Sequence, residues 1–132
     1  MPHLIVEYTA NVALHHDVDA LLDALQESVL EMAVAPVPGV RIRAIQLDRY
    51  RIADNSDTNH AFIAMVARIG PGRDAATKTR IINTLLDSAE AQFATEPSPL
   101  IIAWSLEVQE IEAEFRVNRN NVATAMKNGA DQ

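Results

Sequence analysis

The chain opens on Met1-Pro2-His3-Leu4-Ile5-Val6-Glu7-Tyr8, and this stretch decides how the rest of the sequence is arranged. Residues 3–8 are apolar on both parities, which favours a strand that is covered on both faces. Because this strand begins one residue after Pro2, it holds an amino terminus that would otherwise fray. Once Met1 is removed, Pro2 would carry a secondary amine in a fixed position, and such an amine can act as a base.

Two helices are predicted from apolar side chains that recur at intervals of three and four. Asp17 can cap the first helix, which must end before Pro36. Asp74 can cap the second helix, which ends before Pro97. The apolar stripes are Val18, Leu21, Leu22, Leu25, Val29 and Met32 in the first helix, and Ile81, Ile82, Leu85, Leu86, Ala89 and Phe93 in the second.

Three further strands complete the pattern. Residues 40–51 alternate with a change of phase, which predicts a bulge or a change of partner partway along. A polar loop over residues 53–59 leads to residues 60–69, which are almost continuously apolar and therefore predicted to be a central strand. Residues 100–111 form a long last strand, and a polar tail follows from Arg116.

The order strand, helix, strand occurs twice, over about residues 1–52 and 60–111, within a single domain spanning 1–132. We therefore predict an α+β fold in which two βαβ units form a four-stranded mixed sheet. Right-handed crossovers place both helices on one face of that sheet. The other face is expected to be apolar, and a patch of that size is normally buried, so we predict a homo-oligomer.

Composition and net charge exclude several classes of partner and location for this protein. The 132 residues are 48% hydrophobic, carry a net charge of −7 and include no cysteine. The negative charge argues against nucleic acid and anionic membranes as partners. No segment approaches the length of a transmembrane helix, and the start has no signal-peptide pattern. We expect a cytoplasmic protein.

Few residues are candidates for a metal or phosphate site. The segment 70–72 is Gly-Pro-Gly, which lacks the third glycine and the lysine of phosphate-binding loops. His15 and His16 are adjacent, and we interpret them as solvated loop residues. His3 and His60 could be neighbours at strand ends. Without a cysteine or a histidine–carboxylate motif, we predict no metal and no cofactor.

Arginines next to tight turns are the more informative candidates. Arg41 follows Pro38-Gly39 closely, and Arg73 follows Gly70-Pro71-Gly72 directly. A guanidinium in such a place can bind a carboxylate with two hydrogen bonds, so we predict that both bind an anionic ligand. Arg43, Arg49 and Arg51 are more simply interpreted as partners of the surplus carboxylates.

Four segments resemble one family. They are the Pro-His-Leu-Ile-Val-Glu opening, residues 38–43, residues 62–73 ending in Ile-Gly-Pro-Gly-Arg, and Asn120-Asn121-Val122. Together they resemble the 5-carboxymethyl-2-hydroxymuconate isomerase family of the tautomerase superfamily. The resemblance implies a trimer of duplicated βαβ chains, with Pro2 as catalytic base and Arg41 and Arg73 as substrate-binding residues. It also implies a role in the catabolism of homoprotocatechuate-type aromatic compounds.

The expected reaction moves one proton in an unsaturated hydroxymuconate-type di- or tricarboxylate. Two alternatives stay open from the sequence. The same scaffold and proline could serve another tautomerase-type reaction, such as decarboxylation or dehalogenation of a small acid. The chain could also be a non-catalytic oligomeric module that binds a ligand or a protein.

Overall fold

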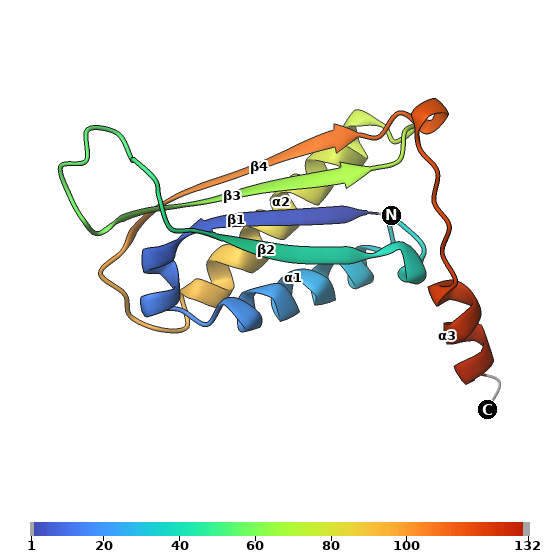
Figure 1. Ribbon diagram of the computed structural model, residues 1–132, viewed down its shortest axis with the longest axis horizontal. Helices are drawn as coiled ribbons and strands as arrows, with labels where there is room; N and C mark the ends of the chain where they lie inside the picture. The colour runs from blue at the N-terminus through green and yellow to red at the C-terminus, as the bar shows by residue number, and fades with distance from the viewer. Residues whose placement is uncertain (1, 131–132) are drawn as a thin grey trace.

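A four-stranded sheet backed by two helices forms the body of the protein, in a computed structural model that describes residues 2–130 (Figure 1). The strand order is β2-β1-β3-β4, with β1 parallel to β2, antiparallel to β3, and β3 parallel to β4. Both long helices lie behind the sheet in this view, which confirms the predicted mixed sheet with its helices on one face. The elements are β1 (His3–Thr9), α1 (Val18–Met32), β2 (Arg41–Leu47), β3 (His60–Ile69), α2 (Ala75–Phe93), β4 (Ile101–Glu110) and α3 (Val122–Ala130), with short 3-10 turns at Ala10–Leu14, Val37–Gly39 and Ala113–Phe115.

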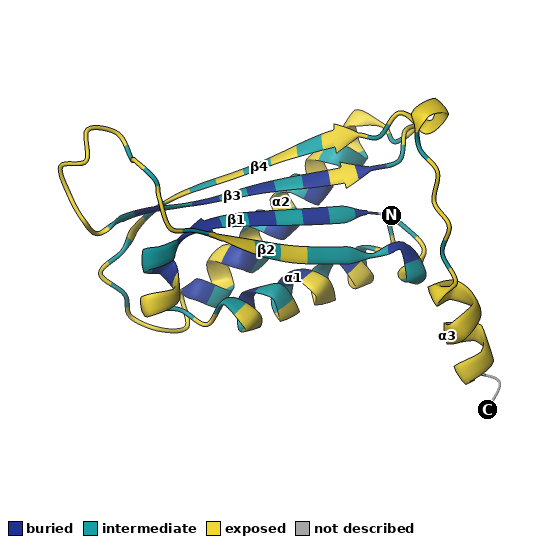
Figure 2. Ribbon diagram, in the orientation of Figure 1, coloured by how far each residue is buried: buried dark blue, intermediate teal, exposed yellow. Residues whose placement is uncertain are grey.

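The core lies between the sheet and the two long helices. Side chains of α1 and α2 that face the sheet are buried, and they belong to the two predicted apolar stripes (Figure 2). Every second residue of β3 is also buried, which confirms its central place in the sheet. The largest fully buried side chains are Leu4, Leu21, Leu25, Ile63, Met65, Ile69, Leu85, Val6, Val12 and Thr9. Removing this apolar area from water is the main stabilising term of the fold.

The helix starts follow from local chemistry. An Asp17 carboxylate oxygen accepts a hydrogen bond from the Ala20 amide at 3.1 Å, and Asp74 accepts one from the Thr77 amide at 2.8 Å. These bonds satisfy amides that have no partner within the first turn. Both predicted caps are therefore confirmed.

The second strand is shorter and more regular than predicted. It ends at Leu47, and it pairs with β1 from Arg41 to Leu47 in one continuous register. The prediction of a bulge or a change of partner within this strand is wrong, as is its extension to residue 51. The reason is that β1 itself ends at Thr9, opposite Leu47, so later residues have no partner strand and form a loop over 48–59.

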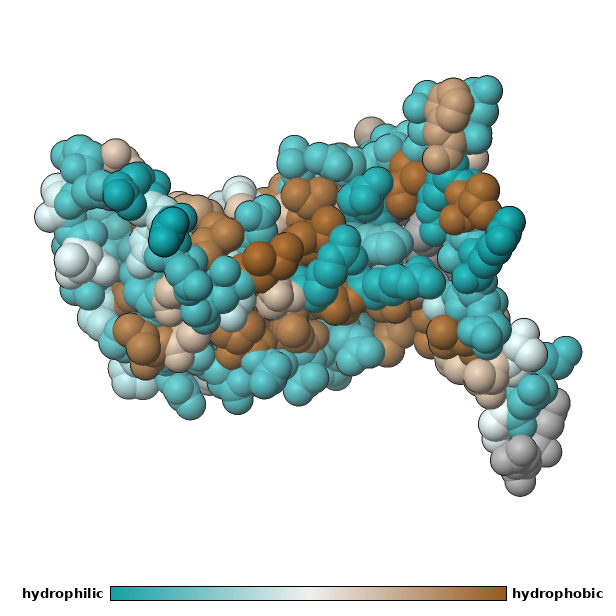
Figure 3. Space-filling model, in the orientation of Figure 1, coloured by the Kyte–Doolittle hydropathy of each residue, from teal (hydrophilic) through white to brown (hydrophobic). Residues whose placement is uncertain are grey.

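The open face of the sheet is mixed in polarity, which corrects the prediction that it is apolar. Its middle carries Ile5, Phe62, Ala64 and Val66, and Figure 3 shows hydrophobic side chains gathered over the centre of this face. Charged and polar residues surround them, namely His3, Glu7, Arg41, Arg43, Arg68, Ser105, Glu107 and Gln109. Strand alternation turns these residues away from the helices, because their neighbours in sequence point into the core.

The last segment leaves the body after β4 and ends in α3. Figure 1 shows this helix at the end of the molecule where the turn before β2 lies. The Asn120 side-chain amide donates a hydrogen bond to the Pro38 carbonyl at 3.2 Å, which ties the segment to the turn before β2. None of the helices within residues 2–130 is long and apolar enough to cross a membrane.

Candidate functional site

Pro2 lies at the start of β1, where the strand ladder already holds the chain. Its carbonyl accepts a hydrogen bond from the Arg41 amide at 3.0 Å, so Pro2 sits beside the first residue of β2. Pro2 is also buried. Pro2 itself is therefore held in place at the edge of the ladder. Met1 lies outside the described residues.

A cavity of about 350 Å³ opens next to this point, on the open face of the sheet. Three strands contribute to it, because the register places His3 of β1 between Arg41 of β2 and Arg68 of β3. The segment after β4 contributes the outer wall, which includes Phe115 and Arg116. Three guanidiniums and one imidazole therefore line a small cavity in a chain whose net charge is −7.

The charges around His3 determine its protonation. Burial lowers the pKa of His3, and the guanidiniums of Arg43, Arg41, Arg116 and Arg68 lower this pKa further. Arg43 Nη1 lies 3.1 Å from His3 Nδ1. A guanidinium can only donate, so Nδ1 must accept this hydrogen bond. The neutral ring then carries its proton on Nε2, which makes His3 a hydrogen-bond donor without adding a charge.

Arg73 has a different setting from Arg41. It follows β3, whose last residues lie at the same end of the sheet as Pro2. Its Nη1 donates to the Gly70 carbonyl at 3.1 Å, and its Nη2 donates to the Val34 carbonyl just beyond α1. Arg80 adds a bond to the Met32 carbonyl at 3.1 Å. Carbonyls at the end of a helix have no partner within it, so these arginines serve as a cap for α1.

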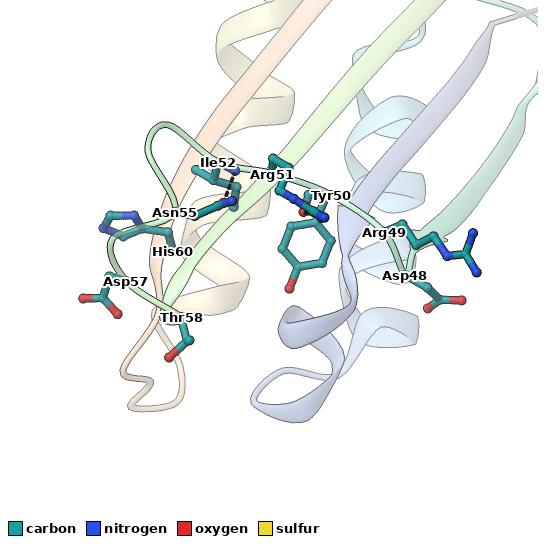
Figure 4. A pocket seen from close by; sticks show the side chains of 9 residues that line it. All are labelled: Asp48, Arg49, Tyr50, Arg51, Ile52, Asn55, Asp57, Thr58 and His60. Carbon is teal, nitrogen blue, oxygen red and sulfur yellow. Dashed lines mark hydrogen bonds between the residues drawn. The ribbon is translucent and has the colours of Figure 1, made fainter.

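A second hollow lies at the opposite end of the sheet, under the 48–59 loop, with a volume of about 380 Å³ (Figure 4). Asn55 Oδ1 accepts a hydrogen bond from the Ile52 amide at 3.0 Å, while Asp48 and Arg49 lie at the other end of the loop. His60 lines this hollow. Because β3 runs antiparallel to β1, His60 and His3 lie at opposite ends, and the prediction that they are neighbours is wrong.

The two adjacent histidines also differ from each other. His15 is exposed, as predicted. His16 is not a solvated loop residue, because its ring stacks on Phe93 with centroids 3.9 Å apart and an angle of 3° between the planes. Burial lowers the pKa of His16, with a smaller contribution from His15. Within the described residues, no group of three His, Asp or Glu side chains could hold a metal ion.

The sequence did not single out two of the arginines that line the cavity. Arg68 is the one charged residue in the apolar strand 60–69, and Arg116 begins the polar tail. The charge of Arg68 within a central strand was a usable signal, because it must point to an open face. No local pattern connects Arg116 with β1, since that contact depends on the path of the chain after β4. Arg43, expected to pair with a carboxylate, binds His3 instead.

The two βαβ units, and a cationic cavity beside Pro2, are the features of a protein of the tautomerase class. The 5-carboxymethyl-2-hydroxymuconate isomerase family model matches residues 2–126, so the chain belongs to that family and is an enzyme of the isomerase class.

Individual relatives agree with this assignment. The chain is 26% identical over 127 residues to a 5-carboxymethyl-2-hydroxymuconate Delta-isomerase from Escherichia coli, an alignment that covers 96% of this chain and 100% of that protein. A crystal structure of a 5-carboxymethyl-2-hydroxymuconate isomerase from Deinococcus radiodurans R1 superposes with a TM-score of 0.85 at 30% identity, covering 95% of this chain and 93% of that one. A fused 4-OT symmetric trimer shares the fold at a TM-score of 0.59 and 19% identity, covering 82% of this chain and 85% of that one.

Proposed function

We propose that this isomerase moves a proton within an unsaturated hydroxymuconate-type di- or tricarboxylate, with Pro2 as the general base. The observation that carries the proposal is the cationic cavity next to Pro2 in a member of this family. The base takes a proton from one atom of the conjugated acid and returns it to another, so no oxidant or co-reactant is needed. Enolate charge that develops between these steps requires positive charge nearby.

Chemistry favours a proline amine for this role. An ordinary α-amino group has a pKa of about 7.7–8.0, closer to neutrality than the roughly 10.4 of lysine. Burial disfavours its protonated form, and so does a nearby guanidinium. Pro2 is buried, and its carbonyl accepts a hydrogen bond from the Arg41 amide, so a free amine at Pro2 would be held in a fixed position. The role requires removal of Met1, because an acylated nitrogen has no basicity.

Arg41 and Arg73 are proposed to bind the carboxylates of the substrate. Arg41 lines the cavity, and its side chain makes one weak hydrogen bond of 3.4 Å to the Gly39 carbonyl. Arg73 uses two of its five N–H donors on main-chain carbonyls, which leaves three for a ligand. Their positive charge would attract an anion to a protein that is negative elsewhere.

Assembly as a homotrimer in the cytoplasm is part of the same proposal, as is a role in homoprotocatechuate-type catabolism. Support for the oligomer comes from the apolar middle of the open face and from exposed apolar side chains on β4 and the last segment. Ile101 is 60% exposed, Phe115 77% and Val117 81%. Large contiguous apolar surface is usually covered in the assembled protein.

Blocking the amine of Pro2 provides the sharpest test. A lysine inserted between Met1 and Pro2 keeps Pro2 acylated and changes nothing else in the chain. Mass spectrometry would establish which residues remain at the amino terminus, and the absorbance of the dienol would report turnover of 2-hydroxymuconate-type acids. We expect the unmodified enzyme to be active and the inserted variant to lose activity by about a hundredfold or more. Equal turnover by a folded inserted variant would refute the role of Pro2.

A further inference from the structure

The cavity beside Pro2 contains more positive charge than one carboxylate needs. Arg41 borders it from β2, while Arg68 and Arg116 approach from β3 and from the segment after β4. No aspartate or glutamate is among the described residues that line it. Across residues 2–130, neither Arg41 nor Arg68 forms an ion pair with a carboxylate. Like charges this close repel one another, so the arrangement favours an anion between them.

His3 fits an anion site better as a neutral donor than as another cation. The hydrogen bond from Arg43 to Nδ1 leaves the Nε2 proton available to a ligand. Burial and the surrounding guanidiniums lower the pKa of His3, which favours the neutral ring near pH 7. A carboxylate oxygen could accept from this N–H while the arginines balance its charge.

The outer wall gives the cavity its shape. Ile111, Phe115 and Val117 come from the segment after β4, and they place apolar atoms next to the charged groups. The segment is held by the Asn120 hydrogen bond to the Pro38 carbonyl, immediately before β2. Phe115 and Val117 are 77% and 81% exposed, so this side of the cavity is open for a ligand to enter.

We infer that His3, Arg68 and Arg116 form a second carboxylate subsite, which binds a substrate carboxylate other than the one bound by Arg41. This inference rests on the proposed isomerase function and names the residues that select acids with an additional carboxylate. Arg68 and Arg116 act in it as binding residues and transfer no proton.

Kinetics with paired substrates test the subsite. The Arg68→Gln and Arg116→Gln variants should raise KM for a tricarboxylate substrate about tenfold or more, with kcat within about threefold. The ratio of kcat/KM for that substrate to kcat/KM for an analogue lacking one carboxylate should fall toward one in these variants. The Arg68→Lys variant should recover part of the preference. Arg119→Gln is the matched control, because Arg119 is exposed, lies three residues from Arg116 and does not line the cavity. We expect this control to behave as the wild type.

Equilibrium binding separates this inference from the proposed function. Titration calorimetry with propane-1,2,3-tricarboxylate, which cannot isomerise, should show binding by the wild type and by Arg119→Gln. Arg68→Gln should weaken it about tenfold or more. If the variants bound the probe as expected but the wild type turned over no hydroxymuconate-type acid, the proposed function would be refuted while the anion site would stand. Turnover by the wild type with equal probe affinity in all variants would refute the subsite and retain the function.

Two other results would also overturn the subsite. If the wild type bound inorganic phosphate as tightly as the tricarboxylate probe at matched ionic strength, the cavity would be a general anion site without selectivity for carboxylates. A lower assembly mass for Arg68→Gln, with unchanged affinity for the probe, would place Arg68 in a contact between copies of the chain. Arg116→Gln, on the segment outside the sheet, provides the same readouts if Arg68→Gln does not fold.

Discussion

Replacing Arg73 with glutamine should destabilise the protein more than the same change at Arg80. Arg73 donates to the Gly70 and Val34 carbonyls, and Arg80 donates only to the Met32 carbonyl. A hydrogen bond from a charged group contributes roughly 1.5–3 kcal/mol when it is shielded, and less when water competes for it. Two partly shielded bonds therefore give a loss of about 2 kcal/mol for Arg73→Gln. The exposed single bond gives about 0.5–1 kcal/mol for Arg80→Gln.

Urea unfolding measures this difference. With a slope of about 2 kcal/mol per molar urea, Arg73→Gln should lower the midpoint by about 1 M and Arg80→Gln by less than half of that. The slope itself should stay the same. Equal midpoints for the two variants would show that the Arg73 hydrogen bonds do not hold the end of α1, and would refute this reasoning. A higher KM in Arg73→Gln alone, measured where both variants are folded, would support the additional role proposed for Arg73 in binding substrate.

Two further predictions concern pH. Because burial lowers the pKa of His16 below its ordinary 6.5, the unfolded chain takes up this proton first, and stability should fall as the pH drops through 6.5. His16→Leu keeps an apolar contact with Phe93, so calorimetry between pH 7 and 5 should show a smaller loss for it; an equal loss would contradict the assignment. The Thr77 hydrogen bonds lower the pKa of Asp74, so its contribution is present above pH 3.8 and disappears as the pH falls further. Asp74→Asn keeps an acceptor for the cap, and its unfolding midpoint should depend less on pH between about 4 and 2; unchanged dependence would argue against this cap.

Local patterns in the sequence were sufficient for the two long helices, their buried faces and the central strand β3. The periods of three and four in α1 and α2, and the caps at Asp17 and Asp74, depend on neighbours within one turn, and the structure agrees with all of them. The apolar strand 60–69 is likewise central. Such features are predictable because the interactions that produce them join residues close in sequence.

The site depended on contacts between distant segments. Pro2 and Arg41 were predictable as candidates from their own chemistry and from a family resemblance. The contribution of Arg68 required the antiparallel register that sets it opposite His3, and that of Arg116 required the path of the chain beyond β4. The same register separates His60 from His3.

The sequence by itself determined where the two long helices and the central strand form, which helix faces are apolar, and that Pro2 and Arg41 are candidates for the chemistry. Only the tertiary structure decided which charges meet around His3, where β2 ends, and how Arg73 is engaged. The physical reason is that propensity and periodicity act over a few residues, whereas strand pairing brings together side chains separated by tens of residues.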